Sequence, residues 1–153
     1  MAQTPFYRWI DSCTTDNDFP CTAYPIGADS SGHNVYVGRT HFEQVLGPVT
    51  VVPELKKASL PGNGKEHAIE KYQLLCMNHF QWLPSHDGKV LPGAIQGGYN
   101  KDGIPLYIGR VCHEGSWIVG TIHPKYGVCY YPYQGKELST KQYEALVSHF
   151  YQV

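Results

Sequence analysis

An internal repeat is the feature that most constrains this chain. The segment YVGR at residues 36–39 returns as YIGR at 107–110, and GKE at 64–66 returns at 135–137. Both second copies begin 71 residues after the first. Because one copy cannot bury an apolar face alone, tandem copies pack against each other. The sequence therefore predicts a single domain over residues 1–153, with pseudo-twofold symmetry.

Composition and periodicity both favour β structure. The chain contains 12 tyrosines and 16 glycines, and its helical periodicity is weak. Residues 34–41, and again residues 105–112, alternate as strands do. Residues 27–32 between strands combine Gly, Asp and Ser, which suit tight turns. We expect an all-β fold of mainly antiparallel sheets, in which repeat one covers about 5–78 and repeat two about 79–153.

The segments that follow the two GKE turns are open to two interpretations. HAIEKYQLL (67–75) and LSTKQYEAL (138–146) fit either one helical turn or an edge strand. The end of the chain, 146–153, is predicted to be a strand with an open edge. Such an edge can pair with a second copy, so a homodimer is among the expected assemblies.

Charge and apolar runs exclude two classes of partner. The formal net charge of −1 gives no electrostatic case for nucleic acid or for an anionic membrane. No apolar run approaches the ~20 residues of a membrane span. The opening MAQTPFYRWIDS lacks the apolar core of a signal peptide. We expect a reduced, cytoplasmic protein whose five cysteines are free thiols, and export by a non-signal route stays open. In an oxidising medium Cys112 and Cys129, on consecutive predicted strands, could form a disulfide.

Metal binding and catalysis find little support. The chain has eight histidines, but no His-Glu-x-x-His or paired Cys-x-x-Cys spacing. Cys112 is close in sequence to His113 and His123, yet no acid or oxyanion-stabilising element accompanies them. We therefore expect no metal, no cofactor and no enzymatic activity.

The motifs, in their order and spacing, resemble the DM-nine repeat family. The second copy carries the pattern closely, the first carries it in degraded form but in register, and together they cover nearly the whole chain. The elements that carry the resemblance are PGA (92–94), GYN (98–100), YIGR (107–110), GKE (135–137) and YEAL (143–146).

This resemblance implies a β-rich protein that recognises carbohydrate. The family includes an invertebrate mannose-binding lectin made of two such repeats, and other members are linked to innate immunity or infection. In that lectin the sugar is held chiefly by an Asp of one turn and a Lys of the following Gly-Lys turn. The Asp position is Asp29 in the first copy and Asn100 in the second. The Lys position is Thr50 and Thr121, so neither copy keeps the lysine.

Side-chain chemistry adds candidates that do not depend on the family. The oxygens of Asp29 or Asn100 can bridge two vicinal sugar hydroxyls, or can instead cap their own turns. Tyr99, Trp117 or Tyr133 can stack on the apolar face of a sugar.

Two arginines lie at matched positions in the middle of predicted strands. Arg39 and Arg110 need partners in a strand-rich core, and Glu66 and Glu137 are the nearest candidates in the repeat pattern. We expect structural ion pairs, Arg39–Glu66 and Arg110–Glu137, in preference to contacts with a ligand.

Two functions compete on these grounds. Lys65 and Lys136 are predicted to be exposed in the GKE turns and to face a ligand, which together with Asp29 favours a carbohydrate site. The partner would then be mannose or a mannose-containing glycan. The loss of lysine at Thr50 and Thr121 favours the alternative, a non-lectin cytosolic interaction or stress-response protein that binds protein or vesicle surfaces. The tyrosine-rich run at 130–133 points the same way.

Overall fold

The computed structural model describes residues 7–16, 19, 23–77 and 79–148. Both repeats fold into the same series of strands. The first contains β1 (Tyr7–Cys13), β2 (Gly27–Ala28), β3 (Asn34–Phe42), β4 (Val45–Val52), the 3₁₀ turn η1 (Pro53–Leu55), β5 (Lys57–Gly62), β6 (Lys65–Ala68) and β7 (Lys71–Met77). The second contains β8 (Phe80–His86), β9 (Gln96–Tyr99), β10 (Pro105–His113), β11 (Ser116–His123), β12 (Val128–Tyr133), β13 (Lys136–Thr140) and β14 (Gln142–Ser148).

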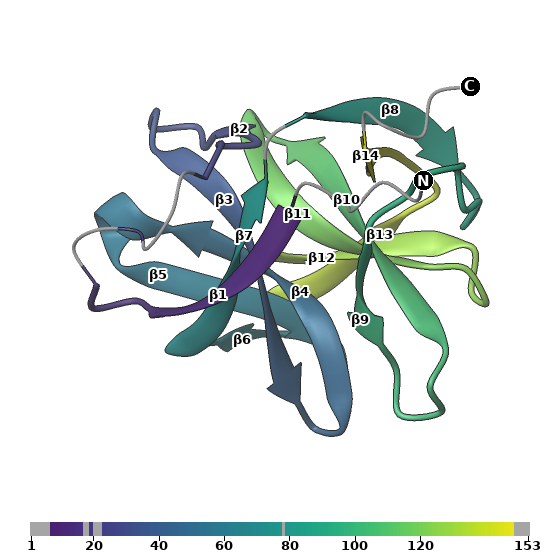
Figure 1. Cartoon of the computed structure of the whole chain (residues 1–153), viewed down its shortest axis with the longest axis horizontal. Helices are drawn as coiled ribbons and strands as arrows, with labels where there is room; N and C mark the ends of the chain where they lie inside the picture. The colour runs from purple at the N-terminus through teal and green to yellow at the C-terminus, as the bar shows by residue number, and fades with distance from the viewer. Residues whose placement is uncertain (1–6, 17–18, 20–22, 78, 149–153) are drawn as a thin grey trace, which may run out of the picture.

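The strands form one antiparallel sheet whose order reads the same from either end. The path is β1-β7-β3-β4-β5-β6-β13-β12-β11-β10-β14-β8, with β2 on β3 and β9 on both β10 and β4. Each strand thus takes the place that its repeat partner takes in the other half, and β6 meets β13 at the centre. Figure 1 shows the blue and teal strands β3 to β6 on one side and the green and yellow strands β10 to β14 on the other. The prediction of an all-β, pseudo-twofold fold is confirmed.

Short hairpins follow from turn residues with positive φ. Between β3 and β4, Glu43 and Gln44 have φ values of 46° and 70°, and between β5 and β6, Asn63 and Gly64 have values of 52° and 80°. Two-residue loops with both central residues at positive φ match the right-handed twist of the flanking strands. The second repeat has the same hairpins at the same offset, so the local turn chemistry sets the strand register twice.

The core is shared between the repeats. One buried cluster takes Val35, Val37 and Leu75 from the first repeat together with Ile108 and Leu146 from the second. Two further clusters each belong mainly to one repeat. Burial across the repeat boundary is the physical reason that the two halves fold as one unit.

Each segment of ambiguous sequence contains the end of one strand and the start of the next: residues 67–75 run from β6 into β7, and residues 138–146 run from β13 into β14. β7 pairs with β1 and β3, and β14 pairs with β8 and β10. Neither segment forms a helical turn, and neither β7 nor β14 is an edge strand, because the aromatic strands β1 and β8 pair with their outer sides. Residues 149–153 of the expected open strand lie outside the described residues. The ends of the sheet path are β1 and β8.

The thiols differ from the expectation that all five are free. Cys13, Cys112 and Cys129 are free, whereas Cys76 forms a disulfide, and Cys21 lies outside the described residues. Burial raises the pKa of the Cys129 thiol far above its ordinary value. Within the described part of the chain, no helix has the length and apolar character needed to cross a membrane.

Candidate carbohydrate site at the repeat interface

A cavity of about 200 Å³ lies between the repeats, and we call it the Asp29 pocket. Its polar wall comes from the first repeat and includes Asp29, Lys57 and Glu66. Its aromatic wall comes from the second repeat and includes Trp117 and Tyr133. A site built from both halves requires the packed pair of repeats.

Strand register explains why Lys57 lies in this pocket. On the β4–β5 hairpin, Thr50 stands opposite Ser59 and Val52 stands opposite Lys57. Side chains directly opposite on antiparallel strands share a face, and alternate residues return to that face. All four line the Asp29 pocket. Lys57 therefore brings an ammonium group to the face that holds Thr50.

Thr50 itself fastens the repeats together. Its hydroxyl donates to Val119 O and accepts from Val119 N, both at 3.2 Å. The side chain is buried, at 9% exposure. Because both bonds lead to the backbone of the other repeat, Thr50 shapes the pocket floor and has little freedom to contact a ligand.

Asp29 organises the turn that forms one rim of the pocket. Its Oδ1 accepts from Ser31 N and His33 N, both at 2.9 Å, and its Oδ2 lies 3.0 Å from His33 Nδ1. Burial acts to raise the pKa of Asp29, but the hydrogen bonds from His33 and Ser31 outweigh it and hold the pKa below its ordinary value. A carboxylate oxygen has two acceptor sites, so Oδ2 keeps one for a ligand.

The same turn is anchored to the second repeat. Ser30 N donates to Ser116 Oγ at 2.8 Å, and Ser116 is part of the pocket wall. This bond fixes the Asp29 rim relative to the aromatic wall, which preorganises the cavity.

Asn100 forms the same turn as Asp29, but it does not line the Asp29 pocket. Its Oδ1 accepts from Asp102 N and Ile104 N, both at 2.9 Å, as Asp29 Oδ1 does with Ser31 and His33. The positions equivalent to Lys57 and Ser59 are Val128 and Tyr130. Asn100 therefore serves as a turn cap, and the ammonium group of Lys57 has no counterpart in its half.

Thr121, the second lysine position of the family pattern, is buried in β11 at 8% exposure. Nearby, the ring of His123 packs 4.5 Å from that of Tyr126. Burial lowers the pKa of His123, with a further contribution from Lys125. Thr121 thus lies close to aromatic rings, with Lys125 as a nearby cation, whereas Thr50 shares its face of the sheet with Lys57.

Three further candidates lie elsewhere. Lys65 and Lys136 are exposed and pair with each other where β6 meets β13, on the pseudo-twofold axis. Tyr99 pairs with Leu46 and its ring lies 6.3 Å from that of His41. None of the three is among the described residues that line the Asp29 pocket.

The prediction that Arg39 pairs with Glu66 and Arg110 with Glu137 is wrong. Arg110 Nη2 lies 2.6 Å from Glu144 Oε1, and Arg39 Nε donates to Gln73 Oε1 at 2.8 Å. The reason is register, since Glu144 stands opposite Arg110 on β14 and Gln73 stands opposite Arg39 on β7. Glu66 and Glu137 are on β6 and β13 and bind turn backbone instead, through Gly135 N and Gly64 N respectively.

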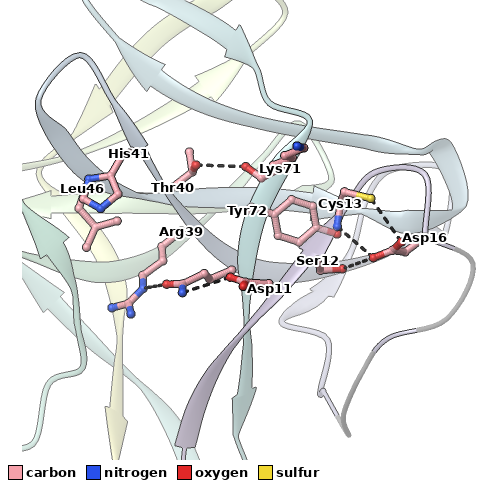
Figure 2. Close-up of a pocket in the computed structure, with 11 residues that line it drawn as sticks. Asp11, Ser12, Cys13, Asp16, Arg39, Thr40, His41, Leu46, Lys71 and Tyr72 are labelled. Carbon is pink, nitrogen blue, oxygen red and sulfur yellow. Dashed lines mark hydrogen bonds between the residues drawn. The ribbon is translucent and has the colours of Figure 1, made fainter.

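Each arginine lines a larger cavity that could not be predicted from the sequence. The Arg39 pocket has a volume of about 590 Å³ and is shown in Figure 2. The Arg110 pocket has a volume of about 680 Å³. Ten residues of one pocket are repeat counterparts of ten in the other, so the two cavities are related by the pseudo-twofold symmetry.

No group of three or more His, Cys, Asp or Glu side chains in the described ranges is placed to hold a metal ion. The chemistry that these cavities offer is hydrogen bonding, charge pairing and aromatic contact.

These features define an all-β tandem-repeat protein with a polar site at the interface of its two halves. Residues 29–140 match the family model described as DM9 repeat, and the chain belongs to that family. No curated protein matches the chain. Its fold is similar to the crystal structure of the nematode sperm cell motility protein MFP2B, with a TM-score of 0.61 and 13% sequence identity. The match covers 94% of this chain and 45% of that one, so the chain spans less than half the length of that neighbour.

Proposed function

We propose that this protein binds carbohydrate, as a lectin-like recognition protein for mannose or mannose-containing glycans. The Asp29 pocket is the proposed site. Its carboxylate, ammonium and hydroxyl groups complement sugar hydroxyls, and its aromatic wall complements the apolar face of a sugar ring. The proposal is one of binding without catalysis.

The observation that carries the proposal is the position of Lys57. The family pattern places a lysine where this chain has Thr50, and the β4–β5 register puts Lys57 on the same face. Asp29 and Lys57 line one cavity. In one pocket, a carboxylate can accept a hydrogen bond from one sugar hydroxyl, and an ammonium group can donate a hydrogen bond to the neighbouring hydroxyl.

A titration with mannose tests this function. The unmodified protein should bind in a saturable manner, and Asp29→Asn should weaken binding by about tenfold, the effect of losing one charge-assisted hydrogen bond. Asp29→Asn should keep the turn, because Asn100 makes the same two backbone bonds. Asn100→Asp is the matched control and should bind as the parent does. Unchanged affinity in Asp29→Asn would refute the assignment.

We further propose a role in innate immunity or infection response, which follows the family resemblance. The protein would act in the cytoplasm or after export by a non-signal route. The disulfide at Cys76 favours contact with an oxidising medium, where such bonds persist. A homodimer would form through the sheet ends β1 or β8, and light scattering would measure its mass.

A non-lectin interaction protein is the alternative. Exposed aromatics favour it: Tyr126 is 61% exposed and Tyr24 50%. The tyrosine-rich run at 130–133 supports it less than expected, because Tyr131 is buried and Tyr130 and Tyr133 are half-buried. Pull-down from native lysate separates the two, since recovery of glycans without a protein partner favours the lectin.

A further inference from the structure

The Arg39 pocket and the Arg110 pocket differ in whether a carboxylate neutralises the charge of the arginine. In the second repeat, Glu144 pairs with Arg110 through Nε at 2.8 Å and Nη2 at 2.6 Å. In the first repeat the counterpart of Glu144 is Gln73, a neutral amide that accepts only from Arg39 Nε. The first repeat therefore keeps the cation and lacks its carboxylate.

The donors of Arg39 can be accounted for one by one. A guanidinium has five N–H groups, and Gln73 takes the one on Nε. The terminal nitrogens Nη1 and Nη2 form no hydrogen bond or ion pair with any residue in the described ranges. The Trp9 ring covers one face of the guanidinium, with Arg39 Cζ 4.3 Å from the centroid of that ring. The N–H groups of Nη1 and Nη2 point along the guanidinium plane, so this contact leaves them available.

Arg39 is half-buried and has no carboxylate partner among the described residues, so its charge is only partly compensated. Burial lowers the pKa of Arg39, although the phenols of Tyr7 and Tyr99 act in the opposite direction. Removing a charge from water is costly unless a counter-charge or hydrogen bonds replace the lost solvation. A bound anion would supply both.

The cavity beside Arg39 has the size of a small-molecule site, about 590 Å³. Gln73 Nε2 donates to Asp11 Oδ1 at 3.4 Å, so one amide links the guanidinium to an acceptor carboxylate. In Figure 2, Arg39 and Asp11 lie toward one end of the pocket, while Asp16 lies at the other with Ser12 and Cys13. Asp16 accepts from Cys13 N at 3.1 Å and from Ser12 Oγ at 3.2 Å, so it is engaged there.

We propose that the Arg39 pocket is a second ligand site, which takes a polyhydroxylated monocarboxylate of the sugar-acid type. The ligand carboxylate pairs with Nη1 and Nη2 of Arg39, in the bidentate geometry that guanidinium and carboxylate share. Ligand hydroxyls donate to Asp11. A single negative charge suits the pocket better than a doubly charged phosphate, because Asp11 and Asp16 repel additional negative charge.

The second repeat explains why one such site is expected rather than two. Glu144 already forms an ion pair with the guanidinium of Arg110, and Arg110 Nη1 donates to Ile26 O. Trp117 and Trp82 lie against the same guanidinium, at 4.1 Å and 4.9 Å. The counterpart of Asp11 is Pro84, which provides no carboxylate.

The test is a calorimetric titration of the full chain with D-glucuronate, with D-glucose and inorganic phosphate as parallel ligands. Glucuronate should bind, and both Arg39→Gln and Gln73→Glu should weaken it by about tenfold or more. Gln73→Glu supplies the internal carboxylate that Glu144 supplies in the second repeat, and it also removes the amide donor to Asp11, so its folding is measured alongside its affinity. Lys136→Gln removes one positive charge on the axis and should leave glucuronate affinity unchanged.

Several outcomes would overturn the proposal. They are no binding of glucuronate, equal binding of glucose, tighter binding of phosphate, or unchanged glucuronate affinity in Gln73→Glu. Circular dichroism of each variant distinguishes lost binding from lost folding. Asp29→Asn should leave glucuronate affinity unchanged, so failure at this site and failure at the Asp29 pocket are measured independently.

Discussion

Glu66 and Gly135 hold the two repeats together by a pair of hydrogen bonds across the pseudo-twofold axis. Glu66 N donates to Gly135 O at 3.0 Å, and Gly135 N donates to Glu66 Oε1 at 2.9 Å. Glu137 and Gly64 make the reciprocal pair, at 3.1 Å and 3.2 Å. The matched Gly-Lys-Glu turns are therefore the junction between the halves, and their glutamates act on the scaffold.

Removing the carboxylate of Glu66 should weaken this junction. Glu66→Ala leaves Gly135 N without its side-chain acceptor, and we expect the free energy of unfolding to fall by about 1 kcal/mol. Urea denaturation measures the change. Glu54→Ala, at an exposed position in η1, is the control and should lie within about 0.5 kcal/mol of the parent. Equal effects of the two variants would contradict the role of Glu66.

The charge of Glu137 should make stability fall as pH rises. Burial raises the pKa of Glu137, although the hydrogen bond from Gly64 N and the nearby His67 lower it in part. The folded state therefore binds the proton more tightly than the unfolded state, and this contribution is lost as pH rises through the folded pKa. Glu137→Gln should remove that dependence. Unfolding midpoints between pH 4 and pH 7 test it, and an unchanged pH profile would contradict the account.

Asp29 should have the opposite effect on pH dependence. Its folded pKa lies below the ordinary value, so its contribution to stability is present above the unfolded pKa and is lost as pH falls through the folded pKa. Asp29→Asn should flatten the acid limb of the stability curve. Asn100→Asp should steepen it, because the same two N–H donors would then face a carboxylate. No difference between these variants at low pH would argue against the turn geometry.

Gly98 should tolerate no side chain. A Cβ on Gly98 would lie 1.8 Å from Leu46 O, which is backbone and cannot move aside cheaply. Gly98→Ala should therefore destabilise the fold by about 3 kcal/mol or more, as overpacking with backbone displacement does. Gly103 has a φ of +79° with nothing within 4 Å, so Gly103→Ala should cost only about 1 kcal/mol of backbone strain. Similar melting temperatures for the two would contradict the close contact.

The fold could be predicted well from the sequence because the same turn and strand patterns occur in both repeats. The turn at Asn63 and Gly64 and its counterpart at Gln134 and Gly135 occur at the expected offset, and both have positive φ. Alternation within each strand indicated its faces without knowledge of its neighbours. Strand type and symmetry could therefore be predicted before any pairing was known.

The side-chain partners could not be predicted in the same way. Arg110 meets Glu144 and not Glu137 because β10 pairs with β14, a relation between strands that are distant in sequence. Sequence reasoning did not single out Lys57 because it lies outside the repeat motifs, and only the β4–β5 register places it on the face of Thr50, in the pocket that Asp29 also lines. The repeat offset did contain one usable signal, the exchange of glutamate at 144 for Gln73 in the first copy.

Binding of mannose in the Asp29 pocket is the central claim, and a crystal structure of the protein grown with mannose tests it most directly. We predict a sugar between Asp29 and Lys57, with a hydroxyl donating to Asp29 Oδ2 and the ring facing Trp117 or Tyr133. A sugar bound in the Arg39 pocket, or an Asp29 pocket that stays empty at saturating mannose, would contradict the account.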